Sequence, residues 1–570
     1  MPQPDLVLLH PPSVYDFRKK TILYGPVSDL IPPSPVFELY PIGFASIAEY
    51  LERAGYQVRI VNLAVRMIND GKFDAEAMIK RLKAPVFGID LHWMVHSHGT
   101  IEIARIVKKY HPEAKIVVGG LSASYYYQEL FRYPEVDYVL RGDSTEEPLR
   151  QLIDCIMSKR KPEAVPNLVW RDSQGEIREN PFSYIPADLS NVMVGHYGNI
   201  IRSVIRYRDL ASYAPFKDWL RYPITAVLTC RGCTENCVIC GGSAAAFRRF
   251  YQRGKIVFRP PKSVVRDVRQ IRRFSNGPIF ILGDLLQPGE DYAYEVLHLL
   301  QKERVKNQLI FELFNPASKE LLRQMSLASP NFCLEISPES HDPEVREAAG
   351  RHYSNQALEQ TIGDALGVGC GRLDVFFLIG LPQQTPQSVL DNIDYCGALL
   401  EKFQGDKRLA LFIAPLSPFL DPGSLGFEHP ERYGYHILFR TLEEHRQALV
   451  SPSWKYSLNY ETEWMTRQQI VDVTYEAMLR LIGLKAKYGV IPEQMAESGE
   501  RRLKAGSEMM QRIDDILSRG NYQNELSCLK PEIDQINALS VSDKVQLELP
   551  IGLIKLKLWR PFWHWLIRRW

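Results

Sequence analysis

Four cysteines stand within eleven residues of one another near the middle of this 570-residue chain. They lie in the segment Thr229-Cys-Arg-Gly-Cys-Thr-Glu-Asn-Cys-Val-Ile-Cys-Gly-Gly, in which Cys233, Cys237 and Cys240 have the spacing Cys-x3-Cys-x2-Cys. Thiolates are the usual ligands of iron–sulfur clusters. Three close thiolates can hold three corners of a cubane and leave the fourth iron open for a cofactor or substrate. The spacing therefore predicts a [4Fe–4S] cluster on these three cysteines.

Two other kinds of site compete for the same residues. A zinc site that also used Cys230 would have only three residues between its two Cys-x2-Cys pairs, which is tighter than zinc sites use. A ferredoxin cluster ligated by all four cysteines would need a different spacing. We interpret Cys230 as a non-ligand that packs near the cluster, and a redox role for it stays open.

The cysteines follow the first strand of an alternating array of strands and helices that runs from Ile224 to about residue 450. Apolar runs separated by helical stretches have the rhythm of a (β/α) barrel, full or partial. The predicted strands are Thr225–Leu228, Ile279–Leu282, Leu309–Leu313, Cys333–Ile336, Asp374–Ile379 and Leu409–Ile413.

The cysteine motif after a first barrel strand resembles the signature of the radical S-adenosylmethionine (SAM) family. The resemblance covers about 220 residues and extends to later strand ends. It implies that Gly283 and Asp284 contact the SAM amino group, although the usual Gly-Gly-Glu is not evident there, which leaves the role of Asp284 open. The other resembling segments are Ser337-Pro-Glu339-Ser340 for the ribose, Phe377-Leu-Ile-Gly380-Leu-Pro382 for the adenine, and Leu416–Gly423 for the sixth strand.

The first 150 residues also alternate strand-like and helix-like segments. This pattern predicts a flavodoxin-like, doubly wound parallel sheet, in which ligands bind at the carboxyl ends of the strands. Gly119-Gly120 and Arg141-Gly142-Asp143 directly follow two predicted strands, so we expect them on that edge. A small hairpin is predicted around Val169 to Ile177.

A sheet of this kind before a radical SAM barrel is similar to the cobalamin-binding radical SAM subgroup. Tyr40-Pro-Ile-Gly43, Val117–Gly120 and Val136–Asp143 carry the resemblance, which implies a bound cobalamin. The implied contacts are Gly43, His92, Gly119, Gly120 and Gly142.

This likeness leaves alternatives open. The cobalt-ligating Asp-x-His-x-x-Gly of many cobalamin domains is absent, and His92 fits a loop histidine at the edge better than an axial ligand. Gly119-Gly120 can also be a plain tight turn, and Gly43 a simple helix start. We expect no metal site from His92, His96 and His98.

Bulk properties set the broad class. The length predicts about two to four domains, with boundaries expected at 1–175, 176–220 (a linker), 221–450 and a mostly helical 451–570. A net charge of +2, without a dense basic stripe or a small RNA-binding module, argues against nucleic acid as a partner. Five scattered cysteines do not resemble a secreted disulfide framework. Without a signal-peptide pattern or a long apolar run, a cytoplasmic location is expected.

The resemblance implies an enzyme that reductively cleaves SAM at the cluster and generates a 5′-deoxyadenosyl radical. With cobalamin, it would methylate or rearrange an unactivated carbon of a small-molecule or lipid-like substrate, as a methyltransferase, cyclase or oxidoreductase. The electrons would come from an external donor such as a flavodoxin or ferredoxin. The alternative is a cobalamin and iron–sulfur binding redox or sensor protein without turnover.

The last residues combine aromatic and basic side chains, which favours the interface of an anionic membrane. Pro561 divides the segment, so one continuous helix is not expected. A tail that packs on the protein's own surface is an equal alternative. The residues concerned are Lys555, Lys557, Trp559, Arg560, Phe562, Trp563, Trp565, Arg568, Arg569 and Trp570.

Overall fold

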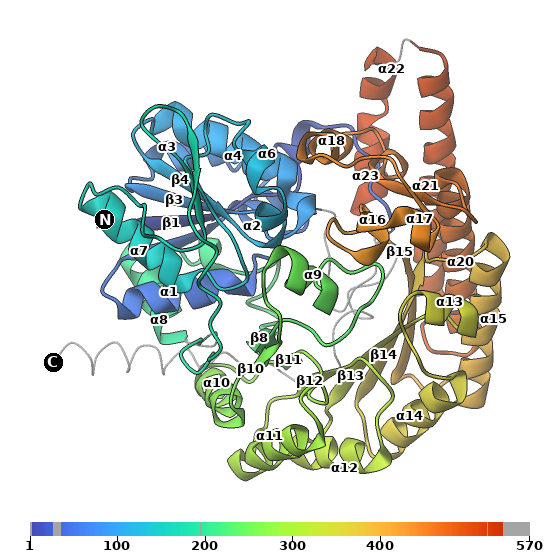
Figure 1. Cartoon of the computed structure of the whole chain (residues 1–570). Coiled ribbons are helices and arrows are strands. Elements are labelled where there is room, and N and C mark those ends of the chain that lie inside the picture. Colours follow the sequence, from blue (N-terminus) through green and yellow to red (C-terminus); the bar gives the residue numbers. More distant parts are fainter. Residues whose placement is uncertain (1–2, 27–35, 194–196, 521–522, 540–570) are drawn as a thin grey trace.

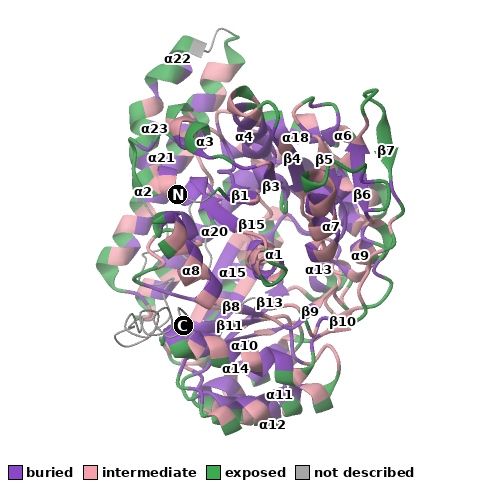
Figure 2. Ribbon diagram, turned by 90° about the vertical axis from the view of Figure 1, so that its left-hand side faces the viewer, coloured by how far each residue is buried: buried purple, intermediate pink, exposed green. Residues whose placement is uncertain are grey.

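The computed structural model describes residues 3–26, 36–193, 197–520 and 523–539. It contains two large, mainly parallel sheets with helices packed against each (Figure 1). The strands of both sheets are largely buried, and exposed residues gather on the outer helices and loops (Figure 2). The predicted α/β class is confirmed.

The first sheet has the strand order β2-β1-β3-β4-β5-β6-β7. The order 2-1-3-4-5 of its parallel part is that of flavodoxin-like folds. β6 (Leu168–Arg171) and β7 (Ile177–Glu179) form the predicted hairpin, which adds antiparallel to β5. The parallel strands are β1 (Leu6–His10), β2 (Val58–Asn62), β3 (Val86–Asp90), β4 (Lys115–Gly119) and β5 (Tyr138–Leu140).

Helices cover both faces of this sheet, which explains why its strands are continuous apolar runs. Leu6 and Leu8 of β1 enter one core, and Val7 and Leu9 enter the other. The helices on the face of Leu6 are α1 (Ile42–Arg53) and α7 (Glu146–Met157), and those on the face of Val7 are α2 (Leu63–Asn69), α3 (Ala75–Arg81) and α4 (Ser97–Tyr110).

The second sheet has six parallel strands in chain order, as a (β/α) barrel requires. Its first and last strands do not pair with each other in the described part of the chain, so the barrel is partial. The strands are β8 (Thr225–Leu228), β11 (Ile279–Leu282), β12 (Leu309–Leu313), β13 (Cys333–Glu339), β14 (Arg372–Ile379) and β15 (Leu409–Pro415). The helices between them are α10 (Pro261–Phe274), α11 (Glu290–Glu303), α12 (Lys319–Ala328), α14 (Asn355–Gly367) and α15 (Pro386–Lys402).

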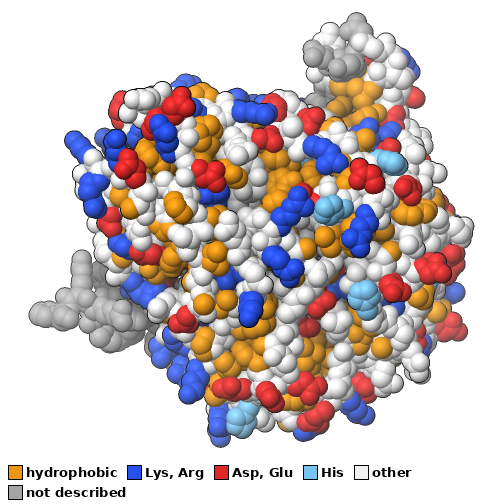
Figure 3. All heavy atoms as spheres, in the orientation of Figure 1, with side chains coloured by type: hydrophobic (Ala, Val, Ile, Leu, Met, Phe, Trp, Pro, Cys, Tyr) orange, Lys and Arg blue, Asp and Glu red, His pale blue; other side chains and the backbone are white. Residues whose placement is uncertain are grey.

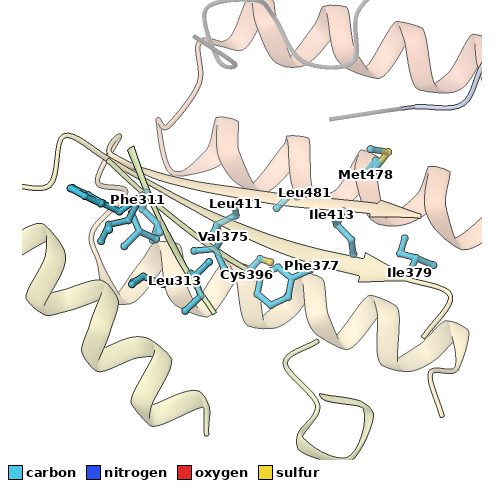
Figure 4. Packing of buried hydrophobic residues seen from close by; sticks show 14 of the residues in the cluster. Phe311, Leu313, Val375, Phe377, Ile379, Cys396, Leu411, Ile413, Met478 and Leu481 are labelled. Carbon is cyan, nitrogen blue, oxygen red and sulfur yellow. The ribbon is translucent and has the colours of Figure 1, made fainter. Parts of the chain in front are cut away.

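The C-terminal region is mostly helical, as predicted, and its first long helix packs against the last barrel strand. Figure 4 shows Met478 and Leu481 of α20 (Arg467–Lys487) beside Leu411 and Ile413 of β15, within one apolar core. The later helices are α21 (Glu493–Ser518), α22 (Gln523–Cys528) and α23 (Lys530–Ala538).

The same helices also hold the N-terminal part of the chain. Arg502 of α21 donates a hydrogen bond to the carbonyl of Tyr24 at 2.9 Å, and Asn537 of α23 donates one to the carbonyl of Ile22 at 2.8 Å. Among the described residues no helix is long and apolar enough to cross a membrane. The aromatic and basic tail, 550–570, lies outside the described residues.

The two sheets meet at their carboxyl edges. The indole of Trp93, which follows β3, donates to Asp421 Oδ1 at 3.3 Å, and Asp421 follows β15. The hydroxyl of Tyr125, which follows β4, donates to Glu428 Oε1 at 2.5 Å. Both barrels and doubly wound sheets bind their ligands at this edge. The fold therefore brings two ligand-binding edges against each other.

Candidate cofactor site between the two sheets

The cysteine loop begins where β8 ends and leads into α9 (Ala244–Phe250). Its start is fixed by a short antiparallel pairing of β9 (Cys230–Arg231) with β10 (Val257–Phe258). Gly232 then turns the chain with φ +98°, a conformation that favours glycine. Cys233 is the next residue, so the turn sets where the motif starts.

The three motif thiols are free and half-buried. The backbone N–H of Glu235 donates to Cys233 Sγ at 3.4 Å, and that of Gly242 donates to Cys240 Sγ at 3.3 Å. Burial raises the pKa of Cys233 and of Cys240, and these donors act against the rise, toward the thiolate form that binds metal. Burial raises the pKa of Cys237 to about 11, and the Arg351 guanidinium acts against this rise.

Cys230 has different surroundings from the other three. Its thiol is buried and donates to the carbonyl oxygen of Gly232 at 3.8 Å, and Gln287 Nε2 donates to its sulfur at 3.9 Å. Burial raises the pKa of Cys230 to about 11. These contacts are those of a packed thiol beside the loop.

In the described part of the chain, no three His, Cys, Asp or Glu side chains stand close enough to hold one metal ion. A cubane makes a different demand, because each thiolate binds its own iron atom. In a cubane the three ligand sulfurs stand further apart than the ligands of a single ion.

Neighbouring elements hold the loop from two sides. The N–H of Ala244 at the start of α9 donates to the carbonyl of Glu235, and the N–H of Gly426 donates to that of Val238, both at 2.8 Å. A carboxylate oxygen of Asp421 accepts from the N–H of Gly241 at 3.1 Å. The loop is therefore anchored along its whole length.

The residues predicted for the SAM amino group lie at the end of β11. A Cβ on Gly283 would stand 2.6 Å from Thr229 Oγ1, and the residue has φ +91°, so only glycine fits. Its N–H donates to Glu312 Oε2 at 2.6 Å. Both carboxylate oxygens of Asp284 accept backbone N–H groups, from Leu286 at 2.8 Å and from Phe314 at 2.7 Å. Asp284 thus ties two barrel loops together.

The predicted ribose motif is buried at the end of β13. Glu339 Oε1 pairs with Arg351 Nε at 3.1 Å, whereas its Oε2 is buried without a hydrogen-bond partner. Burial raises the pKa of this carboxyl, and the Arg351 guanidinium opposes the rise. Ser340 accepts from the N–H of Asp342 at 3.2 Å. An unpartnered buried acceptor is expected where a ligand hydroxyl or water binds.

The predicted adenine motif forms a tight turn after β14. Gly380 has φ +99°, and a Cβ there would stand 2.1 Å from the Tyr460 hydroxyl oxygen. The Gly380 carbonyl accepts from the Tyr435 hydroxyl at 3.0 Å, and Pro382 is buried beside it. Close packing therefore accounts for Gly380 without a ligand.

Three of the residues predicted for cobalamin meet at the carboxyl edge of the first sheet. A Cβ on Gly119 would have only the Leu140 carbonyl oxygen near it, at 3.9 Å. Gly120 has φ +120°, and a Cβ there would stand 2.4 Å from the Cα of His92, which is itself exposed. Gly120 therefore lies in a turn where the backbone of His92 comes close. The backbone at Gly119 and the side chain of His92 remain accessible at the edge of the sheet.

The other two predicted cobalamin residues lie on either side of this group. A Cβ on Gly43, in the first turn of α1, would meet nothing within 4 Å. Gly142, after β5, has φ +104°, and its N–H donates to Ser124 Oγ at 2.9 Å.

The histidines near this edge do not converge. His96 is buried against His10, with ring centroids 4.7 Å apart, and His10 pairs with Asp90 at 3.0 Å. His98 Nδ1 accepts from the N–H of Tyr15 at 3.2 Å. His92 is exposed, and the three histidines face different partners.

Two family models match the chain, one on each sheet. The B12 binding domain model matches residues 34–152, and the Radical SAM superfamily model matches residues 227–396. The chain joins a B12-binding domain to a radical SAM domain. The cysteine loop and the edge around Gly119 lie within these two matches, so the resemblance seen in the motifs is confirmed.

Curated relatives and solved structures are similar to parts of the chain. The hopanoid C-3 methylase of Methylococcus capsulatus is 24% identical over 291 residues, which are 49% of this chain and 50% of the relative. The cytidylyl-2-hydroxyethylphosphonate methyltransferase of Streptomyces wedmorensis is 22% identical over 256 residues, 39% of this chain and 47% of the relative. The chain thus spans about half the length of these two proteins.

A solved structure shares the fold across both domains. TsrM from Kitasatospora setae, a radical SAM methyltransferase solved with cobalamin and a [4Fe–4S] cluster, superimposes with a TM-score of 0.53 at 18% identity. The likeness covers 77% of this chain and 81% of TsrM.

The residues present fit the cofactors that these domains use, namely a [4Fe–4S] cluster, SAM and cobalamin. Three free thiols stand on one anchored loop of the radical SAM domain, two of them with N–H donors at their sulfurs. The unpartnered Glu339 Oε2 fits a SAM hydroxyl. The open backbone at Gly119 fits a bulky ligand on the B12-binding domain.

Two buried ion pairs join the domains beside the cysteine loop. Arg231 donates to Glu146 Oε2 at 3.0 Å and to Ser144 Oγ at 2.7 Å. Arg253 donates to Asp143 Oδ1 at 3.0 Å. Asp143 lies on the predicted binding edge, but its carboxylate is paired with Arg253 of the radical SAM domain. The loop after β5 and the start of the cysteine motif are therefore fixed to each other.

Sequence reasoning missed several residues of this site. Glu312 interrupts an apolar strand, and that lone charge in Leu309–Leu313 could have singled it out. Nothing in the local sequence marks Arg351 as a site residue, because its partners, Glu339 and the Phe314 carbonyl, lie elsewhere in the chain.

Proposed function

We propose that the chain is a cobalamin-dependent radical SAM methyltransferase that acts on an unactivated carbon of a small-molecule or lipid-like substrate. The observation that carries this proposal is the pairing of Arg231 with Glu146. It fixes the cysteine loop against the carboxyl edge of the B12-binding domain, as two cofactors that serve one substrate carbon require. The names of the relatives, a methylase and two methyltransferases, favour methyl transfer.

The residues have assigned parts in this proposal. Cys233, Cys237 and Cys240 hold the cluster, and Cys230 packs beside it. When bound, the cluster and SAM would supply a deoxyadenosyl radical and cobalamin a methyl group. SAM would lie against Gly283, Asp284, Glu339, Ser340, Gly380 and Pro382, and cobalamin against Gly43, His92, Gly119, Gly120 and Gly142.

The chain itself orients these groups and excludes water. Glu339 Oε2 would accept a hydrogen bond from a SAM hydroxyl, while Arg351 balances the charge of the buried carboxylate. Asp284 and Glu312 hold the β11 turn in place through backbone N–H groups. None of these residues needs to gain or lose a proton for this role.

Substrate class is the least constrained part of the proposal. The similar proteins are named for a hopanoid and for a cytidylyl phosphonate, and TsrM was solved with tryptophan. These are three unrelated chemical classes. A shared fold does not carry substrate identity.

The test is anaerobic incubation of the cluster-loaded and cobalamin-loaded chain with SAM labelled in its methyl group. We expect 5′-deoxyadenosine from SAM, and label in a product that is one CH₂ heavier than its substrate. Deoxyadenosine with an unlabelled product would indicate a ring closure, rearrangement or oxidation instead. If a reduced, fully loaded chain formed no deoxyadenosine, it would be a binding or sensor protein.

A further inference from the structure

Exposed arginines surround α9, the helix that follows the cysteine loop. Arg248 and Arg249 lie on α9, and Arg432 and Arg440 lie on the segment after β15. Figure 3 shows Lys and Arg side chains gathered near the centre of this face, where Figure 1 places α9, α16 (Leu425–Glu428) and α17 (Pro430–Tyr433). We call these four arginines the basic face.

Contacts between the elements make these arginines one patch. Arg249 Nη2 pairs with Glu428 Oε2 at 3.2 Å, and Arg249 Nη1 lies 3.4 Å from His429 Nε2. The guanidinium of Arg440 lies 5.7 Å from the ring centre of Phe427, next to Glu428. The N–H of Arg432 donates to the carbonyl of His429 at 3.0 Å. Arg249, Arg432 and Arg440 therefore border the α16–α17 junction, and Arg248 is the exposed neighbour of Arg249 on α9.

The patch keeps a positive charge. Glu428 is the acid closest to Arg249, and its side chain is only 12% exposed, whereas that of Arg249 is 54% exposed. Glu428 also accepts a hydrogen bond from the Tyr125 hydroxyl, so one of its oxygens faces the protein rather than the solvent. Glu431 is an exposed acid on α17. Glu444, also exposed, accepts the N–H of Arg440 at 2.8 Å. Four exposed arginines thus stand beside three acids, Glu428, Glu431 and Glu444, of which Glu428 is largely buried.

The elements that carry the basic face bond directly to the cysteine loop. The first residue of α9, Ala244, donates its N–H to Glu235, which lies between Cys233 and Cys237. Gly426 of α16 donates its N–H to Val238, which follows Cys237. A protein bound to the basic face would therefore contact elements that are hydrogen-bonded directly to the cysteine loop.

We propose that the basic face is the docking surface for the external electron donor, a small acidic one-electron carrier protein. This rests on the proposed function, in which Cys233, Cys237 and Cys240 hold the cluster. In the step, the donor loses one electron and the cluster gains it, and no bond forms or breaks. Opposite charges on two surfaces raise the association rate and fix orientation, and salt weakens both effects.

Charge and shape favour a protein over a small anion. The four arginines are exposed and come from three separate segments of the chain. A small anion would bind where donors converge on one point. A protein with scattered acidic side chains matches spread charge.

The experiment measures how fast the cluster of the full-length loaded chain is reduced in anaerobic stopped flow. The probe is reduced flavodoxin, an acidic carrier. The variant is Arg248→Glu with Arg432→Glu, which leaves the Arg249–Glu428 pair intact. At low salt we expect flavodoxin to reduce the variant about tenfold or more slowly than the wild type. High salt should make this difference in rate smaller. Photoreduced deazariboflavin, a small neutral donor, should reduce both proteins equally fast.

The matched control is Lys302→Glu with Lys306→Glu. It makes the same charge change at two exposed positions, one in the last turn of α11 and one in the loop before β12, at the opposite end of the strands. This control should keep the wild-type rate with flavodoxin. An unchanged rate in the arginine variant, or an equal loss in the lysine variant, would overturn the proposal. If neither donor reduced the wild-type chain, the assignment of the cluster would fail instead.

Discussion

At the scale of single residues, the four clustered cysteines separate into two kinds. Backbone N–H groups donate to the sulfurs of Cys233 and Cys240, whereas Cys230 receives only the side-chain amide of Gln287, at 3.9 Å, and itself donates to a carbonyl. Backbone N–H groups at a sulfur stabilise a thiolate. This difference separates Cys233 and Cys240 from Cys230, and the spacing of the motif adds Cys237 to the ligands.

Replacing Cys233, Cys237 or Cys240 by Ala should therefore abolish SAM cleavage and lower the iron content. Cys230→Ser should keep about wild-type iron, because a serine hydroxyl can donate to Gly232 as the thiol does. Iron per chain and deoxyadenosine formation measure both outcomes. The assignment is wrong if Cys230→Ser loses the cluster while one of the other three variants keeps it.

His98 links the stability of the first sheet to pH. Burial lowers its pKa to about 4, with Arg446 acting in the same direction. A histidine in the unfolded chain titrates near 6.5, so below that pH the unfolded state binds the proton first. The stability that neutral His98 provides is present above pH 6.5 and is lost as the pH falls toward 4. At pH 5 the loss is about 2 kcal/mol.

His98→Gln should reduce this dependence, since the glutamine oxygen can accept the Tyr15 N–H without titrating. The measurement is the thermal unfolding midpoint at pH 7 and pH 5. We expect the wild-type midpoint to fall further than that of the variant. An equal fall in both proteins would show that His98 does not contribute.

At the scale of elements, the sequence predicted the strands of both sheets, because each is a local apolar run between turn residues. The flavodoxin-like order and the partial barrel follow from that alternation. What could not be predicted depends on partners far along the chain. Arg231 and Glu146 are 85 residues apart, and Arg253 and Asp143 are 110 apart. No local pattern marks such pairs.

The same limit applies to the site residues. The motif predicts that Gly380 contacts adenine, and the Tyr460 hydroxyl, which comes from the C-terminal region, leaves no room for a side chain at this position. The motif predicts that Asp284 contacts SAM, and both of its oxygens accept backbone N–H groups from neighbouring loops. A motif gives the position of a residue in the chain. It does not give the neighbours that other elements bring to it.

The Arg231–Glu146 pair allows a test at this scale. Arg231→Gln leaves the Glu146 carboxylate buried without its cation, and breaking a buried pair in this way costs about 3 kcal/mol or more. We expect a lower thermal midpoint and poorer iron retention, because the cysteine loop loses its tie to the other domain.

The matched variant is Arg231→Met with Glu146→Leu, which removes both charges together. It should recover much of the stability, since no uncompensated charge remains. If Arg231→Gln had the wild-type midpoint and iron content, the pair would have no part in holding the loop.

At the scale of the whole molecule, the two domains and the C-terminal helices are tied together from several sides. Arg502 and Asn537 hold the segment after β1, and α20 packs against β15 of the barrel. The domain boundaries predicted at 175, 220 and 450 stay predictions. The first sheet extends to Glu179, and α20 packs into the barrel core.

The tail from Pro550 to Trp570 offers a further test, based on sequence alone. Its tryptophans and cations predict contact with anionic lipid, at about 1 kcal/mol for each basic residue near the surface. We expect the full chain to sediment with anionic liposomes, and a chain that ends at Leu549 to remain in solution. Equal, negligible binding by both would remove the membrane hypothesis and the lipid substrate that it favours.

The most direct test of the central claim is the metal content of the anaerobically purified and reconstituted full chain. If a three-cysteine cubane faces a cobalamin across the two sheet edges, each chain should hold about four irons with matching sulfide. It should also hold one cobalt, with the absorbance bands of both cofactors in one spectrum. Zinc in place of iron, or iron without any retained cobalt, would contradict the account.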